Sequence, residues 1–201
     1  MSHIKFNPRS LVLMVVILAI MLMRVLIVFN TEALSFANFS SVGAVALFGG
    51  AYFSNNLKAY SFPVLSLFIT DILFANTIYK SYSDGFLYDG WYWTYAAIIL
   101  MVVVGKYILR NITLANGALA AIVVTVVHWL VSNIGTWYGN PYNNPLFTQD
   151  VLGYWNCLVL AIPFELRFLS GTLIYGTVMF GSFQLLKSKY PALQRKEVLA
   201  A

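Results

Sequence analysis

The sequence predicts an all-α polytopic membrane bundle of about six transmembrane helices, and two observations carry this prediction. Of the 201 residues, 60% are hydrophobic and only 9% are charged, whereas a soluble domain has about 25% charged residues. Long stretches such as 91–105 and 111–127 contain no acid or base, and a helix needs about 20 apolar residues to cross a bilayer. One transmembrane domain at 1–189 and a short, loose cytoplasmic tail at 190–201 account for the chain.

Six apolar segments are each expected to form a helix. The first, 10–29, begins like a signal peptide, but its apolar run continues past Arg24 and is long enough to span. The second, 40–53, is short and rich in Gly and Ala, which allow close approach of helix backbones. We therefore expect it to be buried within the bundle, as a continuous or a broken helix, and not to face lipid.

The remaining segments are 60–79, 91–110, 112–138 and 155–186. The last of these is too long for one straight span. Pro163 is therefore expected to bend it or to mark the point where it enters from the outer surface. The main predicted outer loop is 140–153, and 30–38 is the other outer loop of note.

The distribution of Lys and Arg predicts the orientation, because these residues resist translocation. With both termini in the cytoplasm, only Lys80 lies outside, which indicates a multi-pass membrane protein. The net charge of +5 is then explained by helix ends in contact with the lipid bilayer, and it does not indicate nucleic acid. The residues placed inside are Lys5, Arg9, Lys58, Lys106, Arg110, Lys187, Lys189, Arg195 and Lys196.

Aromatic residues are concentrated in the predicted outer loops. They fit either an interfacial belt or a vestibule that stacks against a flat ligand, and both roles are compatible. The set comprises Tyr82, Phe86, Tyr88, Trp91, Tyr92, Trp93, Trp137, Tyr138, Tyr142, Tyr154 and Trp155.

Five ionisable side chains lie within the predicted spans, where each would cost several kcal/mol if it faced hydrocarbon. They are Arg24, Asp71, His128, Glu165 and Arg167. At about 1.5 Å per residue, all five fall in the middle to outer half of the membrane, with Asn133 slightly above His128. Their charges nearly cancel, which suggests pairing.

Two interpretations of this layer stay open. The charges are internal salt bridges that hold the bundle in register, with Arg24–Glu165 or Asp71–Arg167 as the first pairs to test. Alternatively, they line a pocket open to the outside, in which Arg24 or Arg167 receives an anionic group. The candidate substrate-binding residues are Arg24, Asp71, His128, Asn133, Trp137, Glu165 and Arg167.

Catalytic signatures are missing from the sequence. It contains no Gly-x-Ser-x-Gly elbow, no two-histidine zinc helix and no Walker A loop. Cys157 is the single cysteine and is expected to be a buried thiol, and no metal site is predicted. We therefore expect neither an enzyme nor a cofactor.

Four strings, in order along the chain, resemble an uncharacterised family of bacterial six-helix membrane proteins. They are residues 38–53 (NFSSVGAVALFGGAYF), 63–71 (PVLSLFITD), 132–137 (SNIGTW) and 155–164 (WNCLVLAIPF). This family is similar in layout to the S components of energy-coupling factor (ECF) transporters. Two features depart from S components: segment 10–29 has only Ala19 where an Ala-x-x-x-Ala pair would dock a partner, and residues 165–172 read ELRFLSGT.

The resemblance implies a compact bundle that binds a vitamin-sized solute near its outer face. It also implies docking on an ECF-type coupling subunit driven by two ATPases. The alternative function is a structural or accessory subunit of a larger membrane complex, which the small-residue face of segment 40–53 favours.

Overall fold

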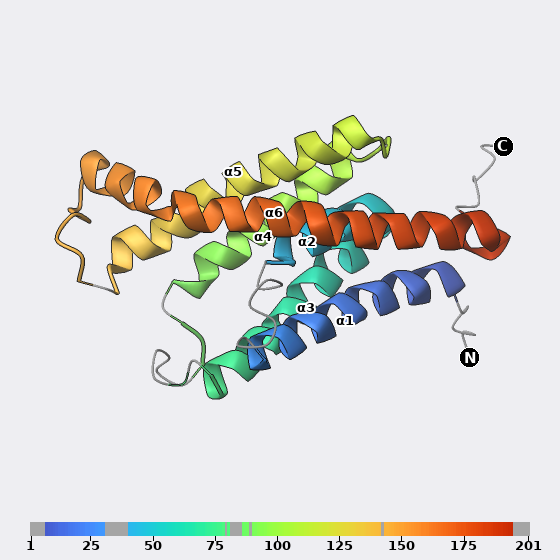
Figure 1. Ribbon diagram of the computed structural model, residues 1–201, viewed down its shortest axis with the longest axis horizontal. Helices are drawn as coiled ribbons and strands as arrows, with labels where there is room; N and C mark the ends of the chain where they lie inside the picture. Colours follow the sequence, from blue (N-terminus) through green and yellow to red (C-terminus); the bar gives the residue numbers. More distant parts are fainter. Residues whose placement is uncertain are drawn as a thin grey trace.

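The computed structural model describes residues 7–30, 40–78, 80, 86–88, 90–141 and 143–194. Within these residues the chain forms six α-helices and one short 3-10 helix, with no strand (Figure 1). The predicted outer loop at 30–38 lies outside the described residues, apart from Asn30. The elements are α1 (Pro8–Phe29), α2 (Val42–Tyr52), α3 (Asn56–Asn76), α4 (Trp91–Ile108), α5 (Leu114–Gly139), α6 (Val151–Lys189) and η3 (Pro191–Leu193).

Five of these helices are long and apolar enough to cross a membrane, which confirms the prediction of a multi-pass membrane bundle. The exception is α2. Its 11 residues extend about 16 Å at the rise of an α-helix, roughly half the hydrocarbon thickness. Segment 40–53 is therefore not a separate span, and the number of spanning helices is smaller than the sequence suggested.

The short helix α2 forms the centre of the bundle. Nine of its 11 residues are buried, and it packs against α3, α4 and α6. Its contact with α4 is a backbone contact, because a Cβ added to Gly50 would lie 2.2 Å from the carbonyl oxygen of Val102. The backbones are equally close at Gly105 on α4, where an added Cβ would lie 2.6 Å from the carbonyl oxygen of Leu47 on α2. The predicted burial of this small-residue segment is confirmed.

Helix α6 has 39 residues and continues through Pro163. Its first turns lie at an angle to the long straight remainder (Figure 1). A proline in a helix interior removes one backbone hydrogen bond and crowds the preceding turn, and the bend is of the kind the sequence predicted. In the turn before Pro163, the Trp129 indole donates a hydrogen bond of 2.8 Å to Leu158 O, which ties α5 to α6.

Asp150 caps the start of α6. Its carboxylate accepts hydrogen bonds from Gly153 N at 2.7 Å and from the Thr148 hydroxyl at 2.8 Å. The Gly153 amide and then the Thr148 hydroxyl lower the pKa of Asp150 from its ordinary value. Hydrogen bonds to the charged carboxylate cause this shift. The cap therefore stabilises the fold fully at pH values above the ordinary carboxyl pKa, and this stabilisation is lost as the pH falls through the lowered pKa of Asp150.

The start of α1 and the short helix η3 meet at one end of the bundle. Arg9 Nη1 donates a hydrogen bond of 2.8 Å to Leu193 O, and the guanidinium lies 5.4 Å from the centre of the Phe183 ring. The start of α1 and the end of α6 are therefore on the same side, which the charge pattern predicts to be cytoplasmic. The beginning of the predicted loose tail is fixed here, since Leu193 is buried in η3.

The glycine contact between α2 and α4 generates a testable expectation. Replacing Gly50 by Ala places a methyl group against the Val102 carbonyl, so one of the two backbones must shift. We expect Gly50→Ala to lower the free energy of unfolding by about 1–3 kcal/mol, measured as thermal unfolding in detergent.

The matched control is Gly176→Ala on α6, where an added Cβ meets nothing within 4 Å. This variant should unfold at the wild-type temperature or slightly above it, because Ala favours the helix. Equal unfolding temperatures for the two variants would show that α2 and α4 are not in backbone contact.

Candidate functional site

A cavity of about 350 Å³ opens between α1, α3, α5 and α6, beside the start of α2. It contains four of the five ionisable residues that the sequence placed in one layer. Asp71 is the exception and lies behind Arg24. The lining residues are Arg24, Ile27, Val28, Ser40, Phe74, His128, Phe164, Glu165, Arg167 and Phe168.

Arg24 is held in place by residues of α3. Its Nη2 lies 2.9 Å from Asp71 Oδ1, and its Nη1 donates to the Thr70 hydroxyl. The guanidinium also lies 4.9 Å from the centre of the Phe74 ring. The second Asp71 oxygen accepts a hydrogen bond of 3.1 Å from Tyr95 OH on α4. One buried carboxylate thus links α1, α3 and α4.

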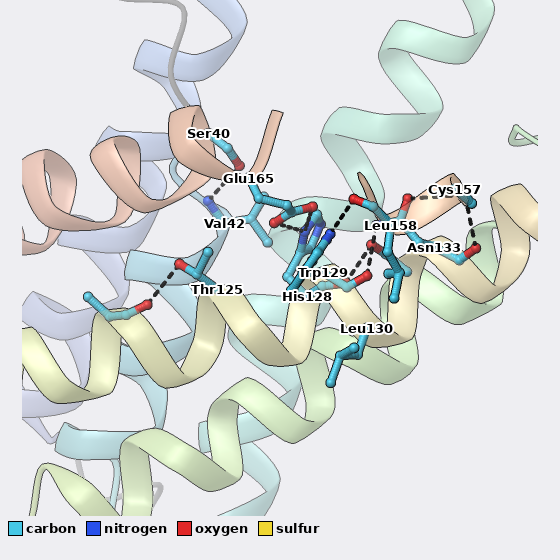
Figure 2. Close-up of polar contacts among 12 residues, drawn as sticks. Ser40, Val42, Thr125, His128, Trp129, Leu130, Asn133, Cys157, Leu158 and Glu165 are labelled. Atoms are coloured by element: carbon cyan, nitrogen blue, oxygen red, sulfur yellow. Dashed lines mark hydrogen bonds and ion pairs between the residues drawn. The ribbon is translucent and has the colours of Figure 1, made fainter. Parts of the chain in front are cut away.

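His128 and Glu165 form the second pair, between α5 and α6. The Nδ1 atom of His128 lies 3.0 Å from both carboxylate oxygens of Glu165 (Figure 2). The imidazole stacks on Phe168, with ring centres 4.2 Å apart and planes inclined by 13°. Because the carboxylate accepts at Nδ1, that nitrogen carries a proton in the arrangement that satisfies both groups. Glu165 is 8% exposed, so this pair is removed from bulk water.

Arg167 differs from the other charged residues of the cavity. It lines the cavity two residues after Glu165, and its side chain is exposed. The described part of the chain offers Arg167 no ion pair, whereas it provides one for Arg24 and for Glu165. A guanidinium has five N–H donors and no acceptor, so Arg167 presents a set of donors at the cavity.

The pairings expected from the sequence are wrong. Arg24 pairs with Asp71 instead of Glu165, and Glu165 pairs with His128. The depth estimate placed these residues in one layer correctly, but depth does not determine which helices are neighbours. In the fold α1 packs more extensively on α3 than on α6, and α5 packs on α6, so Arg24 meets the acid of α3 and His128 meets the acid of α6.

Asn133 and Trp137 do not line this cavity within the described residues. Asn133 is buried, donates to Trp129 O at 2.7 Å, and lies beside Cys157, further along α5 than His128 (Figure 2). Trp137 donates to Thr148 O at 2.7 Å and its ring contacts Tyr154. Both residues connect α5 to the loop before α6 or to the start of α6.

Three phenylalanines form an apolar wall that the sequence analysis missed. Phe74, Phe164 and Phe168 line the cavity together with the charged groups. The aromatic residues singled out from the sequence were those of the predicted outer loops, and several of these pack on one another, as Trp91 does on Phe86 and Tyr92. Two of them could have been found from their place in the sequence, since Phe164 and Phe168 flank Glu165 and Arg167 on the same helix.

The site combines polar groups that can orient a ligand with an apolar surface that can cover it. A volume near 350 Å³ lies at the lower end of the range for small-molecule pockets, about 300–1,000 Å³. His128 and Glu165 are two conceivable metal ligands, and the described residues contain no cluster of three His, Cys, Asp or Glu side chains around them.

The Arg24–Asp71 pair makes a prediction about stability. Asp71→Leu leaves the Arg24 guanidinium without its anionic partner, so we expect a loss of about 1.5–3 kcal/mol in the free energy of unfolding. Removing both charges in Arg24→Met/Asp71→Leu should restore much of that loss. Thermal or denaturant unfolding of the purified variants measures both effects. A double variant no more stable than Asp71→Leu alone would contradict the pairing.

Comparison with known proteins gives one match. The model of a family of unknown function, DUF6580, matches residues 4–193, which is nearly the whole chain. No curated protein and no solved structure matches the sequence.

Proposed function

The chain belongs to DUF6580, a family of unknown function. From its cavity we propose that it is a membrane-embedded subunit that binds or translocates a small solute. The observation that carries this proposal is the opening of Arg24, His128, Glu165 and Arg167 into one cavity. Charged residues within spanning segments are costly and are typically found where they serve a pathway or a ligand.

The arrangement of the pairs supports this proposal further. A charge that acts only as a strut is best surrounded by its partner and by packed side chains, because empty space around it forfeits contacts. Here Arg24 and the His128–Glu165 pair are each satisfied on one side and border the cavity on the other. Arg167 has no internal partner among the described residues to explain its place in the membrane.

The finer proposal is uptake of a vitamin-sized metabolite across a bacterial inner membrane, with the cavity facing outward. The sequence strings that suggested an S-component-like family motivate it, and the clustering of the charged layer toward the predicted outer ends of α1 and α3 supports it. In this proposal an ECF-type coupling subunit with its ATPases supplies the energy, because the sequence contains no phosphate-binding loop of its own.

A ligand screen tests the proposal. We expect one or more compounds from a collection of small metabolites to raise the unfolding temperature of the purified protein and to change its tryptophan fluorescence. Arg167→Gln should weaken binding of such a compound by about tenfold or more, the effect of losing a hydrogen bond to a charged group.

The control for this experiment is Lys187→Gln, which removes a positive charge near the far end of the same helix. It should bind like the wild type. If no compound binds, and if replacing Arg24, Asp71 and Arg167 together by apolar residues leaves growth and solute uptake intact, the cavity has no ligand and the proposal fails.

A structural or accessory subunit of a larger membrane complex is the second candidate. It is favoured by the complete satisfaction of Asp71, whose two oxygens bond to Arg24 and Tyr95, as in a strut between helices. Gentle extraction followed by native mass spectrometry separates the two candidates. A stoichiometric membrane partner without an ATPase module would favour the accessory role.

A further inference from the structure

We propose that the ligand of this cavity is a small, flat organic anion, such as an aromatic or heterocyclic carboxylate. This inference rests on the proposed function and specifies its substrate class. It follows from comparing the hydrogen-bonding groups of the cavity that are already used with those that remain.

The acidic groups are used internally. Both Asp71 oxygens accept hydrogen bonds, from Arg24 and from Tyr95. Both Glu165 oxygens lie 3.0 Å from His128 Nδ1. Asp71 does not line the cavity, and Glu165 shares the single His128 N–H between its two oxygens. Each acid therefore has a partner inside the bundle, on α1 or on α5.

The basic groups keep donors in reserve. The Arg24 hydrogen bonds to Thr70 and Asp71 use two of its N–H groups out of the five that a guanidinium carries. Arg167 makes no hydrogen bond or ion pair with the described residues and lines the same cavity. Among the described residues that line the cavity, Arg167 is thus the acid or arginine without an internal partner, and the matching ligand group is an acceptor with negative charge. A planar carboxylate fits a guanidinium in a two-point contact.

The start of α2 adds positive potential beside these arginines. Ser40 lines the cavity, and the next residue, Ser41, is 1% exposed and makes no side-chain cap. No acid lies in the first turn of α2, so the partial positive charge of a helix N-terminus is not neutralised there. Two buried hydroxyls near this turn, Ser41 Oγ and Thr172 Oγ1, have no hydrogen-bond partner among the described residues, and a Cβ on Gly43 would lie 2.3 Å from the latter.

The apolar wall defines the rest of the ligand. Phe74, Phe164 and Phe168 line the cavity, and Phe168 already carries one stacked ring, that of His128. Aromatic side chains pack favourably on planar rings in stacked or edge-on geometries. A flat ring against this wall leaves its carboxylate free to meet Arg167 and Arg24.

Three probes of nearly equal shape test the sign of the charge: benzoate, neutral benzamide and cationic benzylamine, titrated at neutral pH into the purified full chain in nanodiscs. We expect benzoate to bind at least about tenfold more tightly than either of the others. Arg167→Gln should remove this preference. Arg167→Lys, which keeps the charge, should retain most of it, and this second variant guards against an effect of misfolding.

The outcomes separate this inference from the proposed function. If benzamide or benzylamine binds as tightly as benzoate, or if the compounds found in the metabolite screen are neutral or cationic, the anion inference is overturned and the solute-binding function stands. If no probe binds but the screen yields anions that require Arg167, the inference is supported. If neither probes nor metabolites bind, both proposals fail.

Discussion

The cost of placing charge in an apolar medium governs this molecule. Within a spanning helix a charged group is stable only beside a partner, a polar neighbour or water. Asp71 meets this requirement with Arg24 on α1 and Tyr95 on α4, and Glu165 meets it with His128 on α5. These bonds link α1 to α3, α3 to α4 and α5 to α6, and the two basic side chains among them, Arg24 and His128, line the cavity. The cavity is thus bordered by the groups that fix the bundle.

The half-length helix α2 explains how a cavity fits in so small a bundle. Because α2 extends only about half the membrane thickness at 1.5 Å per residue, it fills the core on the side where α1 begins and α6 ends, and it stops below the charged layer. Its close contacts with α4 at Gly50 and Gly105 fix its position. The space beyond its first turn is bordered by Ser40, Phe168 and the ionisable residues. The short helix α2 thus accounts both for the packed core at one end of the bundle and for the cavity toward the other end.

Sequence patterns predicted the helices well, because hydrophobic runs and the absence of charge depend on the surrounding lipid and little on tertiary detail. They also predicted the common depth of Arg24, Asp71, His128 and Glu165, since depth follows from counting residues along each helix. They did not predict the partners, because the neighbours and rotation of each helix depend on packing of the whole bundle. For the same reason Phe74 and Phe168 were missed, while Asn133 and Trp137 were included in the candidate site although their hydrogen bonds stabilise the α5–α6 region.

The central claim is that the charged layer borders a space that water and solutes reach, and cysteine accessibility tests it most directly. In a Cys157→Ser background, Ser40→Cys and Val28→Cys place single thiols on the cavity lining, and Thr177→Cys places one on an exposed face of α6 away from it. A membrane-impermeant thiol reagent added to protein in nanodiscs should modify the two lining positions much faster than the thiol introduced by Thr177→Cys. Equal, slow modification at all three positions would contradict a solute-accessible cavity and would leave the ion pairs as internal struts.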